Sequence, residues 1–278
     1  MGLKGGFNNF GIVTKFTLKT HEQTEVWGGP MQIAGEHFDA LIAATVEFTD
    51  NVNDPKAQMM TTYSYSQGRV ACALVLFYDG PTAPTGMFDA FLAIPSIQSN
   101  VKTRSFLDLI GATPTGPSYG FRGIFSGFNV LDSTASLLNF IIKEAEVRGK
   151  ELAAKSGIVA AYAVTPFHSS IYSHNTQTTA FPPDRVTPYI PFNMYYSWLN
   201  ATYDNDFYDT ARASAQTITN AAIAEGQSIS PNAAVYPNNA MFGTPLERIY
   251  GDNLPTLRAL KRRVDPLNVM GLAGGFKF

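Results

Sequence analysis

Alternating apolar and polar residues predict several strands in this chain. Over 10–18 the even positions are apolar except for Thr14, which is the period of a half-buried strand. Similar alternation over 59–65 and 70–78, joined by Ser66-Gln67-Gly68, predicts a hairpin. Further extended segments are predicted at 25–33, with a break at Gly28-Gly29-Pro30, and at 121–130, 158–166 and 193–199.

Longer segments with apolar residues on one face predict helices between these strands. One of them follows Asp132-Ser133-Thr134, which supplies an N-cap, and ends near Gly157. Other helices are predicted at 36–52, 87–94, 206–225 and 257–264. Because the strands come in hairpins, without a regular strand-helix-strand rhythm, the predicted class is α+β. We expect a large antiparallel sheet with helices on one face.

The composition indicates a globular protein without a strong overall charge. Of its 278 residues, 45% are hydrophobic, which suffices for one large domain or two small ones. A net charge of −2 gives no general attraction to nucleic acid or to anionic membranes, so we expect a small-molecule ligand. No apolar run reaches the roughly 18 residues of a membrane helix, and no signal peptide is recognisable. The sequence therefore does not define the cellular compartment of the protein. We expect Cys72, inside an apolar run, to be a buried structural thiol.

Nucleotide, nucleophile and metal motifs are incomplete in this sequence. Gly6 and Gly11 have the spacing of a phosphate-binding loop, but Ile12 and Val13 replace its lysine and its serine or threonine. The Gly-x-Gly-x-x-Gly pattern of dinucleotide-binding folds is missing as well. The segment 123–127, GIFSG, has its serine one position too late for a nucleophile elbow and predicts a loop or a bulge. The four histidines form no pair spaced for metal binding, so we expect no metal site.

Segments at both ends of the chain together indicate a family. The first reads GGFNNFGIVT at 5–14, and the others read YPNNA at 236–240, IYGDN at 249–253 and VDPLNVM at 264–270. In this order they resemble the FAD-linked oxidases of the vanillyl-alcohol oxidase superfamily, specifically its berberine-bridge-enzyme-like branch. The tail is similar to that of fungal members. A middle segment, from Thr179 through Arg185 to Trp198, resembles the substrate domain of the same branch.

This resemblance implies FAD as the cofactor and three parts within the chain. Residues 1–20 would end the FAD-binding region, 21–230 would form the substrate-binding domain, and 231–278 would return toward the flavin. The family's N-terminal FAD-binding portion would be absent, so an N-terminal FAD-binding half is an expected partner. By the same resemblance, the residues that contact the cofactor are Gly6, Asn9, Phe10, Gly11 and Asn238. Glycine suits such a position because it lets the main chain approach a ligand closely.

The resemblance also implies catalytic residues. Tyr236 is the first candidate for contact with the substrate or its proton, and Tyr195 is the second. Relatives often have a second tyrosine or an acidic residue where this chain has Asn239. Plant relatives have a glutamate base where this chain has Pro191, which cannot accept a proton. If a base exists here, it must come from another position.

One face of the strand at 193–199 is expected to line the substrate cavity. Asn193, Tyr195 and Ser197 share one face by the period of a strand, and they are our candidate substrate-binding residues. The other face carries Phe192, Met194, Tyr196 and Trp198. The sequence does not decide which set lines the cavity and which packs under a helix.

Two functions follow from the sequence. The first is the substrate-domain part of an FAD-linked oxidoreductase that oxidises a small-molecule alcohol or amine by hydride transfer to flavin, as a fragment or as half of a split enzyme. The alternative is a shortened relative without FAD, acting as a cofactor-free cyclase or a small-molecule binding protein. A third hypothesis is that the chain is an incomplete gene product with no independent function. Retention of the flavin-facing segments favours the first function, while the substrate and the oligomeric state stay open.

Overall fold

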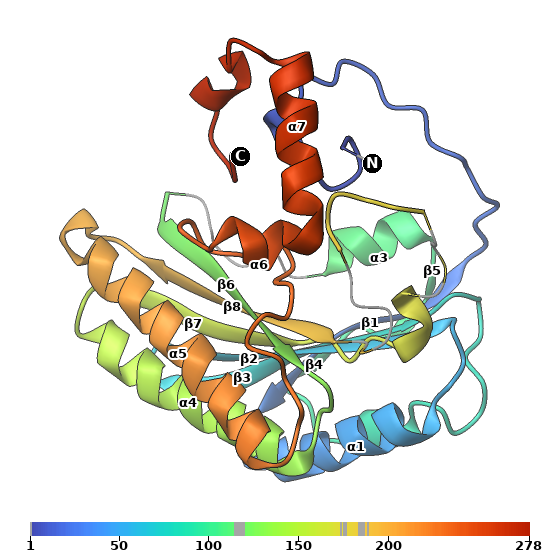
Figure 1. Ribbon diagram of the computed structural model, residues 1–278. Coiled ribbons are helices and arrows are strands. Elements are labelled where there is room, and N and C mark those ends of the chain that lie inside the picture. The colour runs from blue at the N-terminus through green and yellow to red at the C-terminus, as the bar shows by residue number, and fades with distance from the viewer. Residues whose placement is uncertain (1, 114–119, 173, 175–176, 183–186, 188) are drawn as a thin grey trace.

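The computed structural model describes residues 2–113, 120–172, 174, 177–182, 187 and 189–278. Its centre is an eight-stranded antiparallel sheet in the order β4-β1-β3-β2-β7-β8-β6, with β5 also paired to β1 (Figure 1). The strands are β1 (Val26–Ala34), β2 (Ala57–Ser66), β3 (Arg69–Tyr78), β4 (Gln98–Ser99), β5 (Lys102–Arg104), β6 (Arg122–Val130), β7 (Gly157–Val164) and β8 (Ile190–Trp198). The predicted hairpin is therefore confirmed as β2 and β3.

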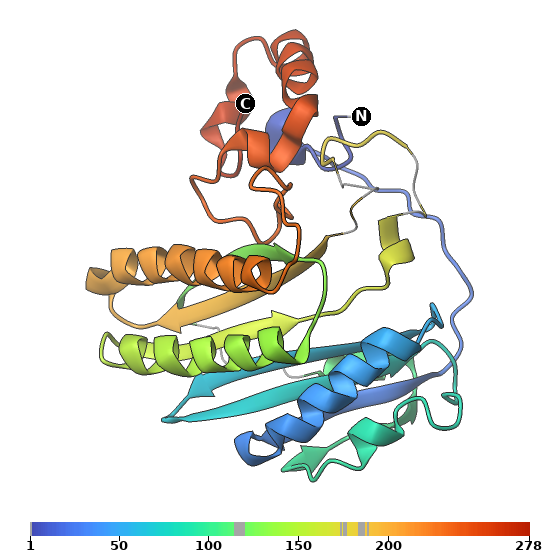
Figure 2. The same cartoon turned by 60° about the horizontal axis from the view of Figure 1, so that its bottom comes forward.

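Three long helices, α1 (Phe38–Asn51), α4 (Ala135–Ala153) and α5 (Asp204–Ala224), lie side by side against one face of the sheet (Figure 2). Helices α6 (Leu246–Tyr250) and α7 (Leu254–Val264) stand on the other side, beside both chain ends (Figure 1). The remaining helices are α2 (Asp89–Leu92) and α3 (Phe106–Ala112), and the 3-10 helices are η1 (Phe7–Asn9), η2 (Gly35–His37), η3 (Ser169–Tyr172), η4 (Ala201–Tyr203), η5 (Gly251–Asn253) and η6 (Val269–Leu272). The predicted α+β class is confirmed.

The main core lies between the sheet and the three long helices. Thr134 begins α4 as predicted, because its side chain accepts a hydrogen bond from Leu137 N at 3.1 Å. The apolar face of α4 then buries Leu137 and Ile141 against the sheet. Cys72 on β3 is fully buried in the same core, and burial raises the pKa of its thiol. This core makes one face of the sheet inaccessible to ligands.

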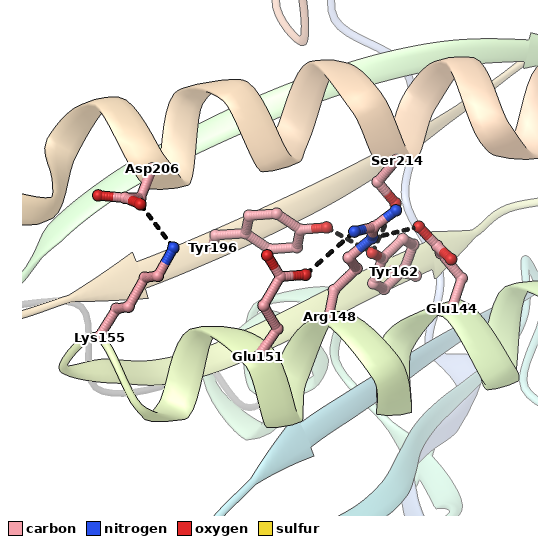
Figure 3. A network of polar contacts seen from close by, with 8 residues as sticks. All are labelled: Glu144, Arg148, Glu151, Lys155, Tyr162, Tyr196, Asp206 and Ser214. Atoms are coloured by element: carbon pink, nitrogen blue, oxygen red, sulfur yellow. Dashed lines mark hydrogen bonds and ion pairs between the residues drawn. The ribbon is translucent and has the colours of Figure 1, made fainter.

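A polar network lies on this helix-covered side (Figure 3). The Tyr162 hydroxyl on β7 bonds to the Tyr196 hydroxyl on β8 and, at 2.8 Å, to Ser214 Oγ on α5. On α4, Arg148 Nε donates to Glu144 Oε1 at 2.7 Å. The three hydroxyl groups are buried and satisfy one another, and burial raises the pKa of Tyr196 to about 12. The network ties α5 to the strands beneath it.

Strand β1 is continuous, and the predicted break at Gly28-Gly29-Pro30 is wrong. A Cβ on Gly28 would lie 2.1 Å from Leu76 O, and one on Gly29 would lie 2.0 Å from Asn100 O. The glycines therefore allow close packing of neighbouring backbone instead of ending the strand. Segment 123–127 is likewise part of β6 in unbroken register with β8, so the predicted loop or bulge is wrong.

The predicted strand at 10–18 is also wrong. These residues belong to no strand, and the apolar side chains of Ile12, Phe16 and Leu18 are 83%, 75% and 80% exposed. Alternation supplies an apolar face, but a strand also needs a partner for its backbone N–H and C=O groups. No strand among the described residues pairs with this segment.

Both chain ends meet in a second, smaller core on the side of the sheet without the long helices. Its buried residues are Ala180, Ile249, Tyr250, Leu254 and Leu257, and Phe10, Phe276 and Phe278 pack against them. Asn9 is fully buried, and its Nδ2 donates to Gly6 O at 2.9 Å and to Phe276 O at 2.8 Å. We call this unit, residues 2–10 with 246–278, the cap. The glycine-rich start of the chain is thus fixed to its tail.

Candidate active site

The sheet face opposite the long helices has a floor of small side chains. In the register of β2, β3 and β7, Thr62 pairs with Ala73 and Ala163, and Ser64 pairs with Ala71 and Ala161. These residues alternate with core residues such as Tyr63 and Cys72, so their side chains point away from the helices. Small side chains leave the backbone of a sheet open to close approach by a flat ligand.

The structure decides which face of β8 lines this site. Phe192, Met194, Tyr196 and Trp198 pack in the main core. Asn193, Tyr195 and Ser197 therefore face the open side, beside the small-residue floor. Ser197 is 1% exposed, and its Oγ forms no hydrogen bond among the described residues.

Tyr195 is held down against the neighbouring strand. Its ring centre lies 4.7 Å from that of Phe125 on β6. A Cβ on Gly123 would lie 2.7 Å from the Tyr195 hydroxyl, so the ring can cross β6 only because residue 123 is glycine. Gly123 was predicted only as part of a loop or bulge, although an isolated glycine inside a strand pattern is also a signal of close approach by another group.

A C-terminal segment that we call the strap, residues 229–245, crosses the edge strand β6. Asn129 Nδ2 on β6 donates to Ala234 O at 2.9 Å. Further along, Asn239 lies over Gly127, where an added Cβ would be 3.0 Å from the Asn239 Cβ. The sequence analysis did not connect Gly127 or Asn129 with the strap. Together they fix the position of the strap above the open face.

Tyr236 and Asn238 lie on this strap. Asn238 Nδ2 donates to the Tyr236 hydroxyl oxygen at 2.9 Å, and Tyr236 is 38% exposed. Tyr236 and Pro191, at the start of β8, line a small cavity of about 20 Å³. The Asn238 amide thus holds the Tyr236 hydroxyl near Pro191, and a role of Tyr236 in proton transfer stays a prediction.

Tyr236 and Tyr195 lie at different points of the same face. Tyr236 is beside Pro191, whereas Tyr195 is four residues further along β8. No hydrogen bond or ring contact between the two is found among the described residues. The two candidate catalytic residues are thus not an acid–base pair in this arrangement. Arg185, from the segment that resembles the family's substrate domain, lies outside the described residues.

The glycine-rich N-terminus reaches the strap through Phe181. Gly5 has φ +84°, and a Cβ there would lie 3.0 Å from Phe181 N. The Phe181 ring in turn meets the Tyr236 ring edge-on at 6.1 Å between centres. The family-like segments at the two ends of the chain, Gly5 on one side and Tyr236 on the other, are therefore joined through one residue of the middle segment.

The four N-terminal residues predicted to contact a cofactor differ in surroundings. A Cβ on Gly6 would lie 2.1 Å from Gly2 O, so Gly6 is required by the turn itself. The Phe10 ring packs against Phe278, with centres 5.6 Å apart. Gly11 has nothing within 4 Å of its Cβ position. Of the four residues, Gly11 thus has open space beside its backbone, whereas Asn9 is fully buried and interacts with Tyr250; cofactor contact by all four stays a prediction.

The described residues show neither a metal-binding cluster nor a membrane-spanning helix. In the described part of the chain, no three His, Cys, Asp or Glu side chains lie together as metal ligands would. None of the helices described above has the length and apolar character to cross a bilayer.

Curated relatives of the chain are fungal. It is 29% identical over 99% of its length to the FAD-dependent monooxygenase sdcF of Emericella nidulans, and spans 59% of that protein. It is 39% identical over 43% of its length to an uncharacterized FAD-linked oxidoreductase of Arthroderma benhamiae, of which the match spans 24%. The oligopeptidase PhomG' of Diaporthe leptostromiformis is 27% identical over 99% of the chain, but the match spans only 23% of that protein. The chain spans 18 to 59% of the lengths of such relatives. No protein-family model matches it.

Solved structures share the fold at low identity. Physcomitrella patens BBE-like 1 has a TM-score of 0.65 at 18% identity, covering 95% of this chain and 57% of that protein. The oxidoreductase GilR has a TM-score of 0.63 at 15% identity, covering 98% of this chain and 62% of that protein. The 6-hydroxy-D-nicotine oxidase of Arthrobacter nicotinovorans has a TM-score of 0.61 at 15% identity, covering 94% of this chain and 57% of that protein.

These findings confirm the resemblance inferred from the two ends of the chain. By sequence the chain is similar to fungal FAD-linked oxidoreductases, and it shares its fold with berberine-bridge-enzyme-like flavoenzymes.

Proposed function

We propose that this chain is the substrate-binding part of an FAD-linked oxidoreductase that oxidises a small-molecule alcohol or amine. The observation that carries the proposal is the convergence of Gly5, Phe181 and Tyr236 beside Pro191 at the start of β8. It brings all three family-like segments of the sequence to one side of the sheet. The FAD-linked relatives supply the reaction class, while the substrate is not defined by these residues.

The residues of the open face fit a flat cofactor in part. In the described structure the Gly11 backbone has open space beside it, and the fully buried Asn9 side chain, which interacts with the Tyr250 hydroxyl, holds the neighbouring turn in place. With Asn238 on the strap, these groups would hold FAD, which when bound supplies the hydride acceptor. Most contacts to its adenine and diphosphate would have to come from an N-terminal FAD-binding half. The exposed apolar residues at 12–18 are available to pair with such a half.

Within this proposal, the chain's own residues bind and orient the substrate. In its phenolate form Tyr236 accepts the substrate's proton, and the Asn238 amide N–H stabilises the negative oxygen until the proton arrives. Ser197 Oγ and Asn193 offer polar contacts from β8, and Tyr195 with Phe125 offers an aromatic wall. This assignment accounts for a proline at position 191, because Tyr236 lies beside it.

The test joins the chain to the portion of the Emericella nidulans relative that lies outside the match, and follows flavin bleaching by a panel of alcohols and amines without oxygen. Tyr236→Phe should slow bleaching by about 100-fold or more, the usual effect of removing an acid–base group. Tyr203→Phe, on η4 outside the site, should leave the rate unchanged. Bleaching at the normal rate by the Tyr236→Phe variant would refute the role of Tyr236. A colourless chain that still converts or binds an apolar small molecule would favour the cofactor-free alternative.

A further inference from the structure

A second cavity lies at the outer edge of the sheet. It measures about 590 Å³, is open to solvent on one side, and is bordered by the edge strand β6, by α5 from Arg212 onward, by the strap and by Arg248 of α6. Apolar side chains form much of its wall, among them Phe128, Ile223, Ile229, Val235 and Met241. A cavity of this size with mostly apolar walls is typical of small-molecule sites in proteins.

The strap lies between this cavity and the small cavity beside Pro191, and Asn129 lines both. Ala233 and Val235 line the edge cavity, whereas Ala234 and Tyr236 line the small cavity beside Pro191. This alternation is that of an extended segment with a different cavity on each side. A ligand in the edge cavity would therefore lie on the opposite side of the strap from the catalytic candidate.

Two arginines line the edge cavity, and they differ in their partners. Arg212 donates to Asp209 Oδ1 at 3.0 Å, and its guanidinium lies 5.2 Å from the centre of the Phe242 ring. Arg248 is half-buried and pairs with no carboxylate among the described residues. Burial lowers the pKa of Arg248, and in the described part of the chain no acidic group counteracts this shift. A partly desolvated guanidinium without an anion is an energetic cost that a bound anion would remove.

The backbone and side chain of Arg248 are both held by the strap. Its Nε donates to Ala233 O at 2.9 Å, and its carbonyl oxygen accepts from Val235 N at 2.7 Å. The guanidinium is therefore fixed before any ligand arrives. A planar guanidinium held in this way matches the two oxygen atoms of a carboxylate.

We propose that the edge cavity binds a small-molecule carboxylate with an apolar body, and that Arg248 holds its carboxylate group. The apolar walls from α5 and the strap bury the rest of the ligand. The site does not depend on the flavin chemistry proposed above, because it lies on the other side of the strap. The carboxylate-binding site and the oxidoreductase site can thus fail independently.

Isothermal titration of the full chain with decanoate tests this site. We expect saturable binding at one site per chain, and no such binding of decan-1-ol, which has the same apolar body without the charge. Arg248→Gln should weaken decanoate binding by about 10-fold or more, since charged hydrogen bonds are among the stronger ones. Arg258→Gln, an equal charge change at an exposed position on α7, should change the affinity less than about twofold.

A second variant keeps the test decisive if Arg248→Gln fails to fold. Ile223→Asp places a carboxylate on a partly exposed wall of the cavity and should weaken decanoate binding by repulsion without touching Arg248. The proposal is overturned if decanoate shows no saturable binding up to about 1 mM, or if both variants bind as the parent does. Displacement of decanoate by ADP would overturn it as well, because the cavity would then belong to the diphosphate site of the cofactor.

Discussion

The fixing of the two chain ends by Asn9 leads to a prediction with a matched control. Asn9 is fully buried, and its side chain donates to Gly6 O at 2.9 Å and to Phe276 O at 2.8 Å. Asn9→Ala removes both bonds and leaves two carbonyl groups without their donors. At about 1 kcal/mol for each bond, with a further cost for the unsatisfied groups, the cap should lose about 2 to 3 kcal/mol. That corresponds to roughly 30- to 150-fold more frequent opening.

Hydrogen exchange measured by mass spectrometry can locate this loss. Exchange should accelerate in peptides from 2–10 and 270–278, while β2 and β3 keep their protection because they belong to the separate main core. Asn8→Ala is the control, since Asn8 also bonds to the tail, through Gly274 O at 3.3 Å and Lys277 Nζ at 2.7 Å, but at an exposed position. Unchanged exchange at both ends in Asn9→Ala, or an equal effect from Asn8→Ala, would refute the reasoning.

Two further predictions concern the polar network under the helices. The pKa of Tyr196 is raised to about 12, so the unfolded chain ionises this residue first, near pH 10, and about 3 kcal/mol of stability should be lost between pH 10 and pH 12. Urea unfolding across this range should show this loss of the free energy of unfolding. In Tyr196→Phe the free energy of unfolding should fall less steeply between about pH 10 and pH 12, because the contribution of Tyr196 is gone. The same pH dependence in the variant and the parent would contradict the assignment. Glu144→Gln should cost about 1 to 3 kcal/mol in the same assay, because it weakens the buried pairing of Arg148. Glu146→Gln, in an exposed pair with Lys150, should cost little, and equal losses would count against a special role for burial.

Much of the fold follows from local patterns in the sequence. The alternation at 59–65 and 70–78 predicts β2 and β3 correctly because one face of each strand is buried in the core. The same alternation fails at 10–18, where no described strand supplies a partner. Helix α3 was missed although Ser105 followed by Asp108 is a readable cap, with Asp108 N donating to Ser105 Oγ at 3.2 Å. Helix α6 has five residues, too few for a visible period.

The candidate site was harder to predict, because it depends on contacts between distant segments. Both faces of β8 carry aromatic residues, and only the packing of α4 and α5 decides that Asn193, Tyr195 and Ser197 face the open side. The approach of the strap to β6 likewise depends on Gly127 and Asn129, which no local pattern connects to residues more than 100 positions away. Family resemblance named Tyr236 and Asn238, and the structure adds the hydrogen bond between them.

The central claim is that the open face of this chain completes a flavin site. The most direct measurement is the flavin content of the chain purified with the portion of the Emericella nidulans relative that lies outside the match, combined with hydrogen exchange with and without FAD. The account predicts a yellow complex with one flavin per chain and new protection at 9–11 and 236–239. A colourless complex, or protection by FAD that falls only on α1, α4 and α5, would contradict it.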